Sequence, residues 1–138
     1  MDPYLSLNGN AAEAAAYYAK AFDAPEPYIM RYSEMPPGEM GEEMPQGLEQ
    51  LVMHANVVTY GGDIMLSDMM PGSSVTPNEA VWITFSHPDV DRLRESFERL
   101  GRDGEVLMPL EKTFFSPLYG QLKDKYGFYW MIMSSEEP

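Results

Sequence analysis

The chain repeats one order of predicted elements, and this repetition limits its fold more than any other feature. Two junctions between a predicted strand and a predicted helix, residues 5–13 and 83–91, share a pattern of residue types although few residues are identical. In each half an amphipathic helix follows the first strand, and three further strands follow the helix. A half of this size cannot bury both faces of its own sheet. The duplication therefore predicts one α+β domain built from two βαβββ modules.

Breaks in the pattern set the boundaries of the modules. The first module is expected to span about residues 1–70 and the second about 78–138, with a linker of proline, glycine and serine at 71–77. Residues 34–50 carry three prolines and no basic residue, lack a core-facing period, and are predicted to form a long acidic loop. Ser86 is predicted to cap the second helix, with Asp89 at its third position. The predicted strands cover residues 3–8, 28–33, 51–60, 64–68, 80–86, 104–110, 118–123 and 128–133.

Charge and composition exclude several classes of function. Nine basic and 22 acidic residues give a net charge of −13, which repels phosphate backbones, so nucleic acid is not expected as a partner. No apolar run approaches the roughly 18 residues of a membrane-spanning helix, and the first residues do not resemble a signal peptide. We therefore expect no membrane partner and a cytoplasmic location. The absence of cysteine excludes disulfides, zinc–thiolate sites and thiol nucleophiles.

Four groups of residues carry a resemblance to a known family. They are Pro3-Tyr-Leu with Glu13-Ala and Tyr18, Met53-His-Ala, Met108-Pro-Leu with Lys112-Thr-Phe, and Asp124-Lys-Tyr-Gly with Trp130-Met-Ile. On these residues the chain resembles the PhnB-like branch of the vicinal-oxygen-chelate superfamily, which includes glyoxalases, bleomycin-resistance proteins and extradiol dioxygenases. The resemblance covers nearly the whole chain. It implies a curved, mostly antiparallel sheet with a concave cup, helices on the outer side, and a homodimer.

The resemblance also allows a test for the metal of that superfamily. Its metal-dependent members hold a divalent ion with His, Gln or Glu from four inner strands. Aligning the helix starts and the turn at Gly127 puts four other residues at or near these positions: Pro3, Met65, Trp82 and Met131. None offers a nitrogen or oxygen donor that such ions prefer, and a shift of register adds at most the carboxylate of Asp63. We therefore predict no metal of the family type, and the sequence indicates no other cofactor.

A pocket can nevertheless be predicted from strand alternation. His54 and Asn56 share one face of their strand together with Val52, and Tyr129 and Met131 share a face of the last strand. His54 has two interpretations, a core or edge histidine satisfied by the backbone, or a polar group of a pocket that can transfer protons. The second interpretation, with the cup implied by the family, predicts that five residues line a ligand pocket: His54, Asn56, Trp82, Tyr129 and Met131.

The predicted function is binding of a small organic molecule in the cup without a family-type metal. Its activity is unassigned, and His54 is the one candidate for catalysis. PhnB-like proteins sometimes carry a methyltransferase name, but no glycine-rich turn opens a helix here to hold a methyl donor, and no nucleophile elbow is present. Two alternatives remain open. One is a metal-dependent lyase, isomerase or dioxygenase of the glyoxalase type. The other is a drug-sequestering protein like the bleomycin-binding members, with a cationic ligand.

Overall fold

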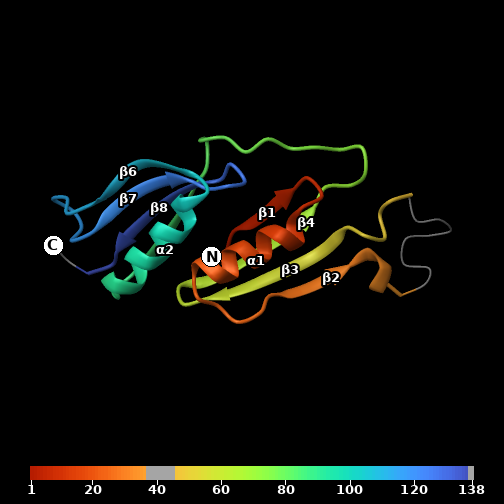
Figure 1. Cartoon of the computed structure of the whole chain (residues 1–138), viewed down its shortest axis with the longest axis horizontal. Coiled ribbons are helices and arrows are strands. Elements are labelled where there is room, and N and C mark those ends of the chain that lie inside the picture. The colour runs from red at the N-terminus through yellow and green to blue at the C-terminus, as the bar shows by residue number, and fades with distance from the viewer. Residues whose placement is uncertain (37–45, 137–138) are drawn as a thin grey trace. The chain divides into compact units, whose positions relative to one another are not determined.

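The computed structural model describes residues 1–36 and 46–136 and divides the chain into two units (Figure 1). The first comprises Met1–Ala19 and Ala24–Val75, and the second Lys20–Asp23 and Thr76–Pro138. Each unit contains one four-stranded mixed sheet, and each sheet has one parallel and two antiparallel pairings. The predicted repetition of strand, helix and three strands is therefore present. In the described part of the chain, no helix is long and apolar enough to span a membrane.

The first unit has the strand order β1-β4-β3-β2. Its elements are β1 (Tyr4–Leu7), α1 (Ala11–Ala21), β2 (Tyr28–Arg31), a 3₁₀ turn (Tyr32–Glu34), β3 (Val52–Thr59) and β4 (Gly62–Asp68). Alternation along the strands buries Leu5, Ala55, Val57 and Leu66 on one face. Figure 1 shows α1 along a face of this sheet, and the helix buries Ala11, Ala14, Ala15 and Tyr18. The small alanines let helix and sheet approach closely.

The predicted acidic loop 34–50 is only partly described. Residues 37–45 lie outside the described part, so the prediction for them has no structural counterpart. Within the described part of this segment, Leu48 is fully buried. One apolar side chain in a proline-rich segment gives no period, and for this reason the pattern did not reveal it.

A buried carboxylate holds the ends of three elements in the first unit together. Asp68, at the end of β4, is 6% exposed. Its Oδ1 accepts hydrogen bonds from the backbone amides of Gly9 at 3.0 Å and Ala11 at 2.9 Å, at the start of α1. Its Oδ2 accepts from the amide of Val52 at 2.9 Å, at the start of β3. A carboxylate from a neighbouring strand therefore satisfies amides at the helix N-terminus, where negative charge is favourable.

The second unit repeats this arrangement with larger side chains and the strand order β5-β8-β7-β6. Its elements are β5 (Trp82–His87), α2 (Val90–Arg102), β6 (Glu105–Glu111), β7 (Tyr119–Lys123) and β8 (Tyr129–Ser134). The spacing of Val90, Leu93, Phe97 and Leu100 predicts a buried stripe on α2; the last three are buried, and Val90 is half-buried. The ring of Phe22 lies 4.7 Å from that of Phe85 and 5.5 Å from that of Trp130, between ring centroids.

The turn between β7 and β8 explains the most specific motif of the sequence. Asp124 is 3% exposed, and its Oδ1 accepts from the amides of Tyr126 at 2.8 Å and Phe128 at 3.1 Å. Its Oδ2 accepts from the indole Nε1 of the fully buried Trp130 at 2.8 Å. Gly127 has a φ of 94°, which glycine adopts without strain. Asp124, Gly127 and Trp130 therefore form a structural turn that fastens β8 to β7.

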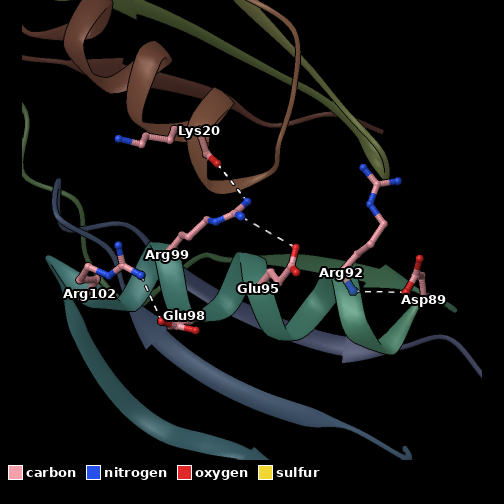
Figure 2. Close-up of polar contacts among 7 residues, drawn as sticks. All are labelled: Lys20, Asp89, Arg92, Glu95, Glu98, Arg99 and Arg102. Atoms are coloured by element: carbon pink, nitrogen blue, oxygen red, sulfur yellow. Dashed lines mark hydrogen bonds and ion pairs between the residues drawn. The ribbon is translucent and has the colours of Figure 1, made fainter.

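The prediction for the start of α2 needs correction. Ser86 is not the cap, because β5 continues through His87. The cap is Asp89, whose side chain accepts from the amide of Arg92 at 3.2 Å. Pro88 explains the shift, since the residue before a proline avoids the helical conformation and the helix can begin only after it. Two ion pairs at a spacing of four residues lie on the surface of α2: Arg99 lies 3.9 Å from Glu95, and Arg102 lies 3.0 Å from Glu98 (Figure 2).

Candidate functional site

The helix-free face of the first sheet carries the polar residues predicted for the pocket. His54 and Asn56 are both half-buried and alternate along β3 with the fully buried Ala55 and Val57. Met30 is the cross-strand partner of His54, and Tyr28 that of Asn56. On the other side Asn56 pairs with Met65, which in turn pairs with Tyr4 of β1. The expectation that His54 and Asn56 share a face is confirmed by this register.

Val52 does not lie on this face, contrary to the sequence prediction. It is fully buried, and its amide donates to Asp68. The register between β2 and β3 shifts at this point, since Met30 pairs with His54 whereas the next residue, Arg31, pairs with Val52. The shift places one extra residue, Met53, in β3 and reverses the direction of the side chain before it. A bulge of this kind leaves no mark in the alternation of residue types.

Asn56 has the most informative environment on the face. Its Nδ2 donates to Oδ2 of Asp63 at 3.2 Å. Its Oδ1 is buried and has no hydrogen-bond partner among the described residues. A buried acceptor without a donor costs about 1–3 kcal/mol, so such atoms need a reason. The ring of His54 lies 5.9 Å from that of Tyr4, which places an aromatic ring beside the two polar groups.

The helix-free face of the second sheet is aromatic and carries the other three predicted residues. Trp82 and Tyr129 are cross-strand partners whose ring centroids lie 5.0 Å apart at an interplanar angle of 57°. Met131 follows two residues along β8 on the same face and is half-buried. The Nζ of Lys123 lies 5.6 Å from the centre of the Tyr129 ring. The structure thus brings Trp82, Tyr129 and Met131 together on one face, as strand alternation predicts.

The structure also contains a groove that the sequence did not predict. It has a volume of about 550 Å³ and lies in the second unit between α2 and β6. Its lining consists of Arg94, Phe97, Glu98, Gly101, Arg102, Val106, Pro109 and Leu110. None of the five predicted pocket residues takes part in it. The apolar residues of β6 are visible in the sequence. They indicate a groove only when the strand is known to lie at the edge of the sheet.

The four residues predicted from the sequence to stand at or near the metal-binding positions of the superfamily do not suit a divalent ion. Met65, Trp82 and Met131 offer thioethers and an indole, and Pro3 offers no side-chain donor. Nowhere in residues 1–36 and 46–136 do three or more His, Asp or Glu side chains gather closely enough to hold a metal. The carboxylate of Asp63, which a shift of register would add, accepts a hydrogen bond from Asn56. The donor set therefore does not fit the ion of the superfamily.

Comparison with known proteins places the chain in a family. Residues 1–133 match the family model described as 3-demethylubiquinone-9 3-methyltransferase. Protein YjdN of Escherichia coli is 33% identical over 137 residues, which cover 96% of this chain and 92% of that protein. A solved structure from Bacillus cereus, a putative 3-demethylubiquinone-9 3-methyltransferase and PhnB protein, is 29% identical with a TM-score of 0.64 over 98% of both chains.

A more distant structure supports the fold alone. It is a glyoxylase/bleomycin resistance protein/dioxygenase domain from Frankia, which is 17% identical with a TM-score of 0.65 and covers 96% of this chain and 94% of that one. This structural similarity extends over both four-stranded sheets and both helices described above. With the family match over 133 residues, the predicted fold class is confirmed. The chain is a PhnB-like member of the vicinal-oxygen-chelate superfamily.

Proposed function

We propose that the protein binds a small organic molecule on the helix-free face of its first sheet and does so without a metal of the family type. The observation that carries this proposal is the buried, unpartnered Oδ1 of Asn56 beside His54 and Tyr4. A ligand with an N–H or O–H donor would satisfy this acceptor and offset the cost of its burial. Small-molecule sites usually combine apolar walls with a few polar groups of this kind.

His54 supplies the second polar group of the proposed site. A neutral imidazole donates through one nitrogen and accepts through the other, so it can hold a hydroxyl or a carbonyl next to Asn56. Met30 and Met65 flank the two residues on neighbouring strands and provide adaptable apolar surface. Trp82, Tyr129 and Met131 are proposed separately as an apolar surface for a ligand on the helix-free face of the second sheet. A homodimer is part of the proposal and can be tested by sedimentation.

The test is a fragment screen followed by two-dimensional ¹H–¹⁵N NMR. Ligands of the site should shift the amide signals of His54 and Asn56, and their affinity should fall about tenfold or more in Asn56→Leu, since a hydrogen bond to a buried amide is lost. The exposed Asp103 provides the control, because Asp103→Asn removes a charge at the end of α2, outside both faces, and should leave affinity unchanged. Hits that shift neither His54 nor Asn56, or that bind Asn56→Leu equally well, would refute the proposal.

A specific observation favours one further candidate, a cationic ligand as in drug-sequestering relatives. Besides His54, the polar groups at this position are acceptors: Oδ1 of Asn56 and the carboxylate of Asp63. Residues 1–69 carry two basic and eleven acidic side chains, so the field of this half attracts cations. Titration with a cationic aromatic dye at low and high salt distinguishes this candidate. Affinity should fall at high salt, whereas a neutral ligand of the first proposal would bind equally at both.

The metal-free part of the proposal has its own measurement. Protein purified without chelator should contain less than about one tenth of an equivalent of any transition metal, because the strand positions lack suitable donors. One tightly held metal per chain, lost in Met65→Ala or Asp63→Ala, would favour the glyoxalase-type alternative.

A titration with S-adenosylmethionine tests whether the chain binds the methyl donor that the methyltransferase name of the family implies. We expect no saturable binding, since no glycine-rich turn opens a helix.

A further inference from the structure

The groove between α2 and β6 exists because one helix cannot cover four strands. A helix is about 10–12 Å wide, and neighbouring strands lie about 4.8 Å apart, so α2 leaves the outermost strand uncovered. Figure 1 shows β6 at the outer edge of the second sheet. The apolar residues of β6 therefore remain exposed, with Val106 at 48%. The groove is a consequence of the module's architecture and is independent of the faces discussed above.

The floor of the groove is apolar. Phe97 of α2 is 7% exposed, and Leu110 of β6 is half-buried. Gly101 contributes no side chain, and a Cβ built at this position would lie 3.0 Å from Cγ2 of Val106. Glycine therefore lets β6 approach the helix and keeps the groove open above this contact. Its volume of about 550 Å³ falls in the range of small-molecule sites.

The rim of the groove carries two arginines and one glutamate, an excess of one positive charge in an acidic chain. Helix α2 carries Arg92, Arg94, Arg99 and Arg102, four of the nine basic residues in a chain of net charge −13. Two of these arginines line the groove, Arg94 and Arg102. Arg102 is paired with Glu98 at 3.0 Å (Figure 2). Arg94 makes no ion pair or hydrogen bond with any other residue in the described part of the chain, so its charge is available to a ligand.

The groove does not suit an added peptide strand. β6 is an edge strand, but Pro109 removes one of its amide donors, and its register against β7 shifts twice. Glu105 and Glu111 place negative charge at both of its ends. These features block pairing of the edge with another chain. They leave the apolar floor and the Arg94 guanidinium as the groups able to hold an occupant.

We propose that this groove binds an amphiphilic carboxylate, a molecule with one anionic head and an apolar chain. The carboxylate would lie against the guanidinium of Arg94, which offers paired N–H donors to both oxygens. The apolar chain would lie over Phe97, Val106 and Leu110. This assigns the protein a second ligand site, distinct from the sheet faces.

Sodium decanoate, kept below its micelle-forming concentration, is the probe for this site. Calorimetry should show saturable binding, and ¹H–¹⁵N NMR should show shifts concentrated at residues 94–110. Arg94→Gln should weaken binding about tenfold, because a charge-assisted hydrogen bond is lost. Val106→Asp should abolish binding by placing an anion on the floor. Both positions are exposed, so the variants should keep the far-UV circular dichroism of the wild type.

Arg92→Gln is the matched control, since Arg92 belongs to the same helix but does not line the groove. Figure 2 shows Arg92 and Glu98 leaving the helix on different sides. Equal weakening in Arg92→Gln and Arg94→Gln would mean that only the general charge of the helix matters, which overturns the proposal. Binding of decyltrimethylammonium as tight as that of decanoate would do the same. If a second copy of the chain covers the groove, decanoate will not bind and Arg94→Gln will change the sedimentation coefficient, which also overturns it.

Discussion

Replacement of Asp124 by alanine should destabilise the second unit strongly. The carboxylate is 3% exposed and accepts hydrogen bonds from the amides of Tyr126 and Phe128 and from the indole of Trp130. Alanine removes these acceptor contacts. The indole N–H is the most costly loss, because Trp130 is fully buried and water cannot reach it.

The magnitude follows from the burial of each donor. An unsatisfied buried N–H costs about 1–3 kcal/mol, and each of the two part-buried amides loses roughly 0.5–1 kcal/mol when water replaces the carboxylate. We therefore expect Asp124→Ala to lower the free energy of unfolding by about 3 kcal/mol. For a chain of this size this corresponds to a melting temperature lower by roughly 10 °C. Asp124→Asn should cost less, since the amide oxygen can still accept from the two backbone amides.

Urea unfolding followed by tryptophan fluorescence is a direct assay, because both tryptophans of the chain, Trp82 and Trp130, lie in the second unit. The exposed Asp103 gives a control, and Asp103→Ala should change the unfolding free energy by less than about 0.5 kcal/mol. In a Trp130→Phe background the cost of Asp124→Ala should fall by about half, as the indole donor is already absent. A loss below about 0.5 kcal/mol for Asp124→Ala would refute the reasoning.

Three further predictions concern single side chains. Asp68→Ala should lower the unfolding free energy by about 2–4 kcal/mol, measured by circular dichroism, since the amides of Gly9, Ala11 and Val52 lose their acceptor; an unchanged midpoint would contradict this. Asn56→Leu should stay within about 1 kcal/mol of the wild type, because losing the bond to Asp63 is offset by removing the unpartnered Oδ1. A loss above about 2 kcal/mol would show that Oδ1 is satisfied. Glu98→Gln should cost less than about 0.5 kcal/mol, as its ion pair is exposed; a larger loss of thermal stability would count against this.

The sequence predicted the elements of this fold better than their ends. The two-module order, the apolar stripe of α2 and the pairing of Glu98 with Arg102 follow from local periodicity. The cap of α2 was misplaced because strand and cap patterns overlap at Ser86, and only the extension of β5 decides between them. Asp68 was not recognised at all. Its partners are 16 to 59 residues away, so no local pattern shows that a strand carboxylate satisfies a distant helix start.

The candidate site was predictable only where local alternation of residues along a strand determines it. Alternation alone places His54 with Asn56, and Tyr129 with Met131, on common faces. The bulge that buries Val52 could not be predicted, because an extra residue in a strand does not change the residue types around it. The unpartnered Oδ1 of Asn56 is a three-dimensional property with no counterpart in the sequence. The groove beside α2 likewise depends on the relative widths of a helix and a sheet.

A crystal structure of the protein purified from cells and soaked with the best fragment tests the central proposal most directly. We predict density for a small molecule on the helix-free face of the first sheet, with a donor atom about 2.7–3.2 Å from Oδ1 of Asn56 and a polar contact to His54. The contradicting result is equally clear. It would be a protein donor, such as a backbone amide, bonded to Oδ1, with side chains packed over His54 and Asn56 and the fragment bound elsewhere.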